Sequence, residues 1–555
     1  MVSRLIHFRS KTITSAAFLL ATTALISRVL GLFRDRILAG KFGAGDELDI
    51  FFAAFRVPDL LYNIVIAGAI SSAFIPVFIS LYAKDKKEAW RAASNFLNIA
   101  IASLLVLGAL FVVISPLLVK FVAPGFDEVN GAITINVTRI MFLSPLFLGM
   151  SAIFGGILHS FRRFLTYALA PIFYNLGIIF GAVFLADAMG AYGLAFGVVL
   201  GSFLHFMIQI PSVFFSGFAW RAVFDLKDKY FQKIFFLMIP RTLGLVVFQL
   251  NLWVITAVAS MLSSGSIAIF NLANHLQFLP IGIIGYSFAT AAMPSFAKSV
   301  SREKAKLFGS QLTKSIRMVL FFVVPTSALI FVLRAHVVRL VFGSGAFSWD
   351  DTRLTAAVLG IFAFGIFAHS LIPLLSKAFY AMQNTKTPVI INSIGFFINV
   401  ALSVFFVFVL LKNTQASGFI SGLLDMEGVS NIALLGLPLA FSLAGIVNLA
   451  ILFYALKRNT GGLMASDIYL AGVKILVASL ISGLAAYGTL FLVEPLFDTK
   501  TAPGLFFQAG IAALVGGAVY IAIMFILRSQ ELVSFWKMFR GKMRFSPYPH
   551  EPNGR

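Results

Sequence analysis

Apolar stretches long enough to cross a bilayer recur along almost the whole of this 555-residue chain. A helix needs about 20 apolar residues to span a hydrocarbon layer that is roughly 30 Å thick. Backbone polar groups find no water in that layer, so a helix, which satisfies them internally, is expected for each stretch. Fourteen such stretches are present, at residues 14–38, 50–82, 95–122, 137–160, 166–186, 191–216, 234–261, 267–297, 315–341, 354–380, 388–411, 432–456, 467–492 and 504–527. They predict an all-α polytopic membrane protein with fourteen transmembrane helices.

The composition agrees with this fold class. Hydrophobic residues make up 59% of the chain and charged residues 12%, about half the charged share of a soluble protein. The first apolar stretch runs past twenty residues and has no small-residue cleavage site, so it is expected to be retained as a helix. The absence of cysteine excludes disulfides and thiolate metal sites.

Basic residues alternate between successive loops. The loops after the second, fourth, sixth and eighth stretches are rich in lysine and arginine, whereas the odd-numbered loops carry almost none. The positive-inside rule places the basic loops and both termini in the cytoplasm. The net charge of +21 is therefore mainly a topology signal, and the basic tail is also expected to contact anionic headgroups. No soluble domain gathers this charge, so we expect no nucleic-acid partner.

Several motifs recur at a nearly constant offset. Ile-x-Arg-x-Leu-Gly-Leu occurs at 26–32 and 239–245, and Pro-x-x-x-Asn occurs at 171–175 and 388–392. Shared order and spacing indicate an internal duplication. Because each copy holds six helices, the copies have the same orientation, which predicts two parallel six-helix lobes with a substrate site between them near the midplane.

These features predict the following organisation of the chain. The parts are an N-lobe at 1–220, a cytoplasmic linker at 221–233, a C-lobe at 234–457, two additional helices at 458–530 and a basic cytoplasmic tail at 531–555.

The repeated motif puts Arg28 and Arg241 within apolar stretches. An arginine near the middle of a membrane helix costs about 2.5 to 3.5 kcal/mol on insertion scales, so it usually faces a water-filled cavity. Arg28, Gly31 and Asp35 share one helical face. Asp35 is then either a structural partner of Arg28 or part of a ligand site, and Gly31 is expected to leave room beside Arg28. Arg34, off that face, adds a further positive charge.

Other polar residues and helix breakers complete the candidate set. Arg56 is either a ligand-binding group or a local ion-pair partner of the acid three residues later. We expect gating or hinge roles for Gly31 and for prolines that interrupt helices, namely Pro58, Pro240 and Pro280. His275 lies among three amides beside such a break, which leaves a packing role and a ligand role equally open. Gln249 and Asn251 are weaker candidates for an ion-coupling site.

This inventory favours an anionic substrate. Guanidinium groups bind diphosphate and carboxylate with paired hydrogen bonds, whereas a cationic drug would call for several uncompensated carboxylates. The chain has no Gly-x-x-x-x-Gly-Lys-[Ser/Thr] loop, His-Glu-x-x-His or Gly-x-Ser-x-Gly motif. We therefore expect a transporter that is not an enzyme and has no metal site.

Four segments carry a resemblance to a known family. They are Ser27-Arg-Val-Leu-Gly-Leu-Phe-Arg-Asp35, Phe42-Gly-Ala-Gly45 with Asp49, Ala123-Pro-Gly-Phe126, and Phe379-Tyr-Ala-Met-Gln-Asn-Thr-Lys-Thr-Pro388. Over roughly residues 14–530 the sequence resembles the MurJ (MviN) lipid II flippases of the multidrug, oligosaccharidyl-lipid and polysaccharide (MOP) exporter superfamily. The resemblance implies a V-shaped, fourteen-helix transporter in the bacterial cytoplasmic (inner) membrane. Its implied substrate is the undecaprenyl-diphosphate-linked peptidoglycan precursor, moved from the inner to the outer leaflet, and it implies functional positions at Arg28, Arg34 and Asp49.

The sequence departs from the family pattern at three positions. Tyr62 and His275 stand where such proteins typically have arginine, and Asn384 stands where an acid is often found in a possible ion-coupling site. We expect Tyr62 and His275 to line the substrate site and Arg241 to replace part of the lost charge. No cofactor is expected, and the energy source is membrane potential or coupling to sodium or protons.

The expected partners are membrane lipids and the lipid-linked glycan, and we expect a monomer that associates with the cell-wall synthesis machinery. Three alternatives stay open at this point: export of another lipid-linked oligosaccharide, a cation-coupled drug antiporter, and a membrane scaffold that does not transport.

Overall fold

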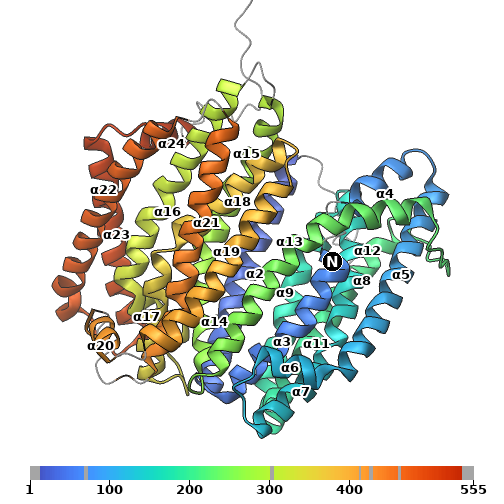
Figure 1. The fold of residues 1–555 in the computed structure, drawn as a ribbon, viewed down its shortest axis with the longest axis horizontal. Helices are drawn as coiled ribbons and strands as arrows, with labels where there is room; N and C mark the ends of the chain where they lie inside the picture. Colours follow the sequence, from blue (N-terminus) through green and yellow to red (C-terminus); the bar gives the residue numbers. More distant parts are fainter. Residues whose placement is uncertain are drawn as a thin grey trace, which may run out of the picture. The chain divides into compact units, whose positions relative to one another are not determined.

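The helices of this chain pack into two units, each with its own interior (Figure 1). The computed structural model describes residues 13–67, 73–300, 305–411, 414–423, 429, 431–460 and 464–539, and the secondary structure of these residues is entirely helical. Unit 1 consists of Met1–Ile269 and Val341–Asp351, and unit 2 of Phe270–Leu340 and Thr352–Arg555.

Unit 1 begins with the long helix that carries three arginines. Its elements are α2 (Ile13–Phe42), α3 (Asp46–Tyr62), the π-helical turn η1 (Asn63–Ala67), α4 (Ile75–Tyr82), α5 (Lys86–Val113), α6 (Ser115–Val122), α7 (Glu128–Met141), α8 (Leu143–Ser160), α9 (Phe164–Phe180), η3 (Gly181–Leu185), α10 (Ala186–Met189), α11 (Ala191–Met207), α12 (Ile210–Phe214) and α13 (Lys229–Ser260).

Unit 2 contains most of α14 and the later helices, except for residues 341–351 at the end of α16 and the start of α17, which belong to unit 1. Its elements are α14 (Ser266–Pro280), η4 (Ile281–Gly285), α15 (Tyr286–Ser299), α16 (Ala305–Phe342), α17 (Trp349–Ala363), α18 (Ile366–Ala381), α19 (Lys386–Phe405), η6 (Phe406–Leu410), α20 (Thr414–Leu423), η7 (Ile432–Leu435), α21 (Gly436–Asn459), α22 (Ala465–Val493), η8 (Glu494–Leu496), α23 (Ala502–Ile526) and α24 (Gln530–Phe539).

The predicted class of multi-span helical membrane protein is confirmed. Within the described residues, ten helices are long and apolar enough to cross a bilayer, or up to twelve when each of two bent pairs counts as one span. The count of fourteen and the division at residues 220 and 234 stay predictions.

Two predicted hinge prolines lie close to π-helical turns. Pro58 lies within α3, which passes into η1, and Pro280 ends α14, where η4 begins. A π turn widens the helix and interrupts its regular hydrogen-bonding pattern. Such turns are frequent at functional sites. The side chain of Pro240 lies outside the described residues, and the hinge motions themselves stay predictions.

Close packing fixes the position of α9 within unit 1. A Cβ atom added at Gly177 of α9 would lie 2.2 Å from the Cα atom of Gly201 in α11, so no larger residue fits there. Small residues where helices meet allow backbones in membranes to approach closely. Because α9 also packs against α2, this close approach sets the frame for the charged residues of α2.

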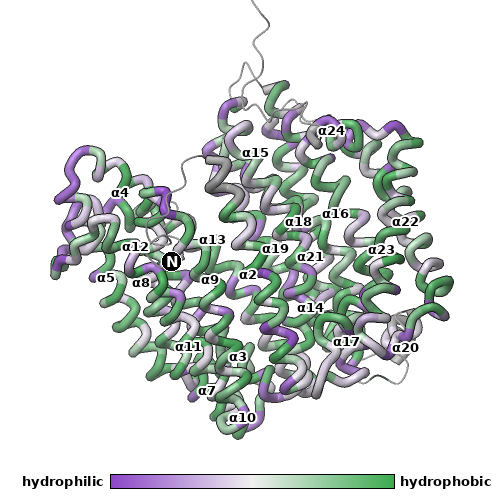
Figure 2. The backbone as a smooth tube through the Cα atoms, turned by 180° about the vertical axis from the view of Figure 1, so that it is seen from behind, coloured by the Kyte–Doolittle hydropathy of each residue, from purple (hydrophilic) through white to green (hydrophobic). Residues whose placement is uncertain are grey.

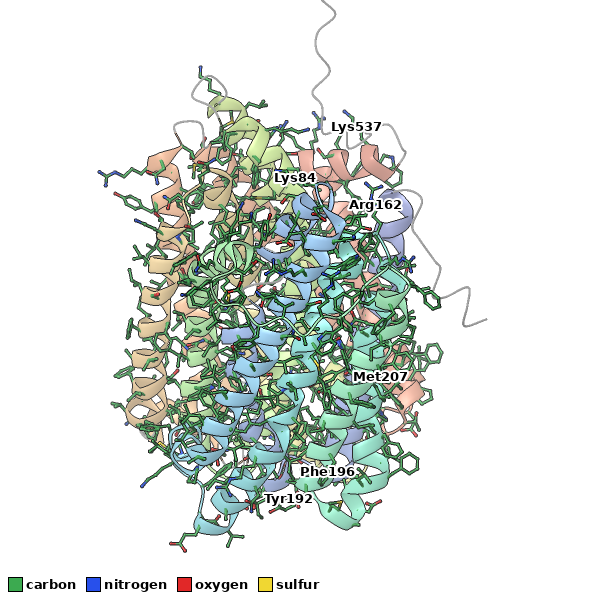
Figure 3. The ribbon with its side chains drawn as sticks, turned by 90° about the vertical axis from the view of Figure 1, so that its right-hand side faces the viewer. Lys84, Arg162, Tyr192, Phe196, Met207 and Lys537 are labelled. Carbon is green, nitrogen blue, oxygen red and sulfur yellow. The ribbon has the colours of Figure 1, made fainter. Side chains whose placement is uncertain are left out.

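The two ends of unit 1 carry different loops, as Figure 3 shows. Lys84 and Arg162, in the loops after α4 and α8, lie at one end, and Tyr192 at the start of α11 lies at the other. The basic loops therefore share one end, as their predicted alternation requires.

A short helix is the last element in the described part of unit 2. Figure 1 shows α24 running across the ends of longer helices in this unit. Glu531 of α24 accepts hydrogen bonds from Arg317 Nε and from Ser529 Oγ, and its side chain is 5% exposed. Burial raises the pKa of the Glu531 carboxyl, but these hydrogen bonds outweigh burial and lower it below its ordinary value of 4.5. The start of the predicted basic tail is thus a helix anchored to α16.

We expect Glu531→Ala to lower the free energy of unfolding by about 3 kcal/mol, because it leaves Arg317 buried without its partner. A carboxyl whose pKa is lowered by folding stabilises the fold above its unfolded pKa and loses that contribution as the pH falls through its folded pKa. The difference in melting temperature between wild type and Glu531→Ala should therefore persist from pH 8 to pH 5 and shrink below pH 4.5. A difference that is absent at pH 7, or that grows in acid, would contradict the anchoring role; Glu128→Ala serves as an exposed control.

Candidate functional site

Two adjacent residues of α2 neutralise each other. Arg34 Nη2 lies 2.7 Å and Arg34 Nε 3.0 Å from Asp35 Oδ1, and Asp35 is 2% exposed. Arg34 Nη1 also donates to Asn175 Oδ1 at 3.0 Å, which ties α2 to α9. The structural partner of Asp35 is therefore Arg34 and not Arg28, and the pair joins two helices.

Asn175 belongs to the first Pro-x-x-x-Asn motif. Its Nδ2 donates to the carbonyl oxygen of Pro171 at 3.0 Å, so both the oxygen and the nitrogen of the amide form hydrogen bonds. In unit 2 the corresponding Asn392 of α19 accepts a hydrogen bond from Asn448 Nδ2 of α21 at 3.0 Å. Each copy of the motif thus uses its asparagine to join two helices. Gly31 faces the first of these asparagines, since a Cβ there would lie 3.9 Å from Asn175 Oδ1.

Arg28 lines a cavity of about 740 Å³ within unit 1. Helices α2, α4, α8, α9 and α11 contribute to its walls, and Tyr62, at the end of α3, also lines it. The side chain of Arg28 is exposed, and none of the described residues forms an ion pair or hydrogen bond with it. The cavity therefore presents one uncompensated guanidinium group, and the structure brings two predicted site residues, Arg28 and Tyr62, to the same space.

Another part of the cavity wall is polar but carries no formal charge. Ser151 Oγ of α8 lies 2.6 Å from His205 Nδ1 of α11, and Gln209 Nε2 donates to Ser151 Oγ at 2.5 Å. All three residues line the cavity with Tyr167. Sequence reasoning missed this group, although His205 and Gln209, four residues apart in an apolar stretch, were a usable signal.

Asp49 holds a loop at the end of unit 1 opposite Lys84. Its Oδ2 accepts from the backbone N–H of Gly265 at 2.8 Å and its Oδ1 from that of Ala268 at 2.7 Å. These donors precede and begin α14, so the carboxylate caps the positive end of that helix. A Cβ at Gly190 would lie 2.8 Å from Glu47 Oε1, which places this cluster at the Tyr192 end.

Further loops from the quoted motifs pack at the same end. Gly125 N donates to Ser260 Oγ at 3.1 Å, and the N–H of Ala346 donates to the carbonyl oxygen of Gly40 at 2.7 Å. Gly265, at φ +85°, leaves no space for a side chain, because its Cβ would lie 2.2 Å from the carbonyl oxygen of Ala44. Two of the quoted motif segments, those with Ala44 and Asp49 and with Gly125, therefore lie with Gly265 in one region, which we call the outer cluster.

Arg56 has a different environment from Arg28. It is 9% exposed, its Nε donates to Thr256 Oγ1 at 3.0 Å, and its carbonyl oxygen accepts from Trp253 Nε1 at 3.1 Å. These hydrogen bonds join α3 to α13, and Arg56 is not among the residues that line the 740 Å³ cavity.

The predicted site residues of the C-lobe lie on several helices. The side chain of Arg241 lies outside the described residues. His275 is half-buried on α14, where its neighbour Asn274 accepts a hydrogen bond from Gln277 Nε2 at 2.7 Å. Gln249, in α13, is 7% exposed.

Asn251 also lies on α13, close to Gln249 in sequence. Its role in ion coupling stays a prediction. Asn384 binds Thr387 twice: its Nδ2 donates to the hydroxyl at 2.9 Å, and its Oδ1 accepts from the backbone N–H at 3.1 Å. The amide thus caps the start of α19.

The family is shown by a match to most of the chain. The family model described as "Lipid II flippase MurJ" matches residues 38–508. The chain belongs to the lipid II flippase MurJ family. The matched segment includes the Asp49 loop, Tyr62 and the whole polar wall of the cavity, and it begins after Arg28 and Arg34.

Curated relatives in this family match over most of their length. A "probable lipid II flippase MurJ" of Rhizobium tropici is 28% identical over 523 residues, which cover 90% of this chain and 92% of the relative. Another of the same name, from Vibrio cholerae, is 30% identical over 412 residues, which cover 72% and 78%.

Solved structures share the fold. A structure titled "Lipid II flippase MurJ, inward closed conformation" is 25% identical, has a TM-score of 0.72 and covers 95% of this chain and 100% of that chain. An inward-facing multidrug resistance transporter of the MATE family, in the MOP superfamily, is 14% identical with a TM-score of 0.63, covering 81% of this chain and 98% of that one. The second likeness concerns the fold alone.

The adjacent pair on α2 gives a stability prediction. Arg34→Gln should destabilise the protein by about 3 to 5 kcal/mol, because it removes the guanidinium partner of the buried Asp35 carboxylate. Arg34→Gln with Asp35→Asn should recover at least half of that loss, as measured by denaturant unfolding in detergent micelles. Additive losses in the double variant would show that the two side chains do not act as a pair.

Proposed function

We propose that this chain is a lipid II flippase, which moves the undecaprenyl-diphosphate-linked peptidoglycan precursor from the inner to the outer leaflet of the bacterial cytoplasmic membrane. The observation that carries the proposal is the unpaired guanidinium of Arg28 on the wall of a 740 Å³ cavity, in a chain of the lipid II flippase MurJ family. The chain acts as a transporter and needs no catalytic group.

The charge of the cavity selects the diphosphate. A guanidinium group donates paired hydrogen bonds to phosphate oxygens and keeps its charge at any physiological pH. Arg34 is already neutralised by Asp35, so in unit 1 the positive charge available to a ligand in this cavity comes from Arg28. Tyr62 lines the same cavity and supplies a hydroxyl donor. A cationic drug would meet repulsion there.

The proposed architecture has fourteen transmembrane helices, arranged as two parallel six-helix lobes that give alternating access in a V-shaped transporter. The corresponding helix-joining hydrogen bonds of Asn175 and Asn392 support the duplication. The additional helices α22 and α23 are hydrophobic over most of their length (Figure 2), and exposed leucines such as Leu480 and Leu484 suit them to contact the polyprenyl tail.

The topology follows from the loop charges. The end of unit 1 with Lys84 and Arg162 faces the cytoplasm, and both termini lie on that side. The outer cluster then lies at the external face. There the hydrogen bonds that Asp49 accepts from the backbone N–H groups of Gly265 and Ala268 hold the exit closed. Release of substrate requires these bonds to break, and membrane potential or coupled sodium or proton movement drives the cycle. The transporter works as a monomer beside the cell-wall synthesis machinery.

A replacement experiment tests the proposal. In cells whose own flippase is depleted, expression of this chain should restore the labelling of lipid II on the outer leaflet. Arg28→Ala should reduce that labelling at least about tenfold, because loss of a charge-assisted hydrogen bond to phosphate weakens binding by roughly 1.5 to 3 kcal/mol. Arg28→Lys should retain part of the activity.

The matched control is Arg221→Ala, an exposed arginine in the linker. It should flip like the wild type at equal expression. Full activity of Arg28→Ala would remove Arg28 from the site, and appearance of a different lipid-linked glycan in place of lipid II would refute the proposed substrate.

A further inference from the structure

The uncharged wall formed by Ser151, His205 and Gln209 has no role in the capture of a diphosphate. Ser151 lies on α8, His205 on α11 and Gln209 between α11 and α12, and all three line the same cavity as Arg28. A polar group in a membrane helix is costly, and such groups commonly mark substrate pathways when they face a cavity. The wall therefore indicates a second ligand-binding group in this cavity, besides Arg28.

Gln209 presents an acceptor without a donor. The residue is 1% exposed, and none of the described residues donates a hydrogen bond to its Oε1 atom. Buried polar atoms of this kind are rare, because their lost hydration must be replaced by a partner. A Cβ added at Gly155 would lie 3.4 Å from this oxygen and 2.8 Å from the ring of Tyr167, so the lack of a side chain at Gly155 lets the ring and the oxygen lie close together there.

The other two residues provide a donor. Gln209 Nε2 donates to Ser151 Oγ at 2.5 Å, and also to the carbonyl oxygen of His205 at 3.3 Å. The hydroxyl hydrogen of Ser151 has two acceptors within reach, His205 Nδ1 at 2.6 Å and the His205 carbonyl oxygen at 3.1 Å, and the shorter contact directs it to Nδ1. A neutral imidazole that accepts at Nδ1 carries its proton on Nε2, which becomes a donor. The wall thus offers one acceptor and one donor, with no formal charge.

We propose that this wall binds an amide group of the transported molecule, in its N-acylated sugar or peptide portion, while Arg28 binds the diphosphate. An amide N–H matches the open acceptor of Gln209, and an amide carbonyl matches the Nε2 donor of His205. The ring of Tyr167 gives the sugar an aromatic face in the same cavity. This inference rests on the proposed function and adds a subsite that distinguishes amide-bearing glycans from those with hydroxyl groups alone.

The test compares two probes that differ in one group: undecaprenyl-diphosphate-linked N-acetylglucosamine and undecaprenyl-diphosphate-linked glucose. Binding of each to the purified full chain in detergent is measured by native mass spectrometry. The wild type should bind the N-acetylated probe about five- to tenfold more tightly, the ratio expected for one additional satisfied hydrogen bond. Gln209→Leu should remove that preference and leave the affinity for the glucosyl probe within twofold.

A second variant and a control keep the result interpretable if Gln209→Leu folds poorly. Gly155→Ala keeps Ser151, His205 and Gln209 but places a methyl group 3.4 Å from Gln209 Oε1 and 2.8 Å from the Tyr167 ring, which must shift. It should therefore also remove the preference. Gln232→Leu, at an exposed position of α13, should bind both probes like the wild type.

Three results would overturn the subsite. The first is a wild type without preference between the probes, which leaves the proposed function intact. The second is a preference that persists in both Gln209→Leu and Gly155→Ala, and the third is an equal loss of both probes in these variants, which indicates a structural role only. A wild type that binds neither probe would refute the proposed function together with the subsite.

Discussion

A guanidinium group in an apolar layer needs a partner, and this requirement divides the arginines of unit 1 into two kinds. Arg34 is satisfied by Asp35 and Asn175, and Arg56 bonds to Thr256. Both lie where helices meet, and there they stabilise packing. Arg28 has a cavity beside it and no such partner among the described residues. Arg28 is therefore the arginine left to bind a ligand, because Arg34 and Arg56 already bind other groups of the protein.

Close backbone packing makes this division possible. Gly177 allows α9 to approach α11, and the position of α9 brings Asn175 within reach of Arg34. At the outer cluster, the hydrogen bond from Gly265 N–H to Asp49 holds a loop of the predicted C-lobe against the predicted N-lobe. Close backbone contacts at glycines thus occur both between the helices of unit 1 and in the loops of the outer cluster.

Much of the fold could be predicted from the sequence, because bilayer thickness and loop charge are strong constraints on a helical chain. The place of Arg28 beside a cavity was also predictable, since an arginine at membrane depth usually faces one. The pairing of Arg34 with Asp35 was not, because adjacent residues point about 100° apart on a helix and only the long arginine side chain closes that gap. The spacing of His205 and Gln209 was a usable signal, but their contacts with Ser151 depend on how α8 packs against α11, and no local pattern encodes that packing.

The most direct test of the central claim is the binding of undecaprenyl diphosphate to three purified forms of the chain: wild type, Arg28→Ala, and the charge-neutral pair Arg34→Gln with Asp35→Asn. If Arg28 supplies the ligand-binding charge and Arg34 does not, Arg28→Ala should weaken binding at least about tenfold. The paired variant should bind within about twofold of the wild type. A paired variant that loses as much affinity as Arg28→Ala, or an Arg28→Ala protein that binds normally, would contradict the account.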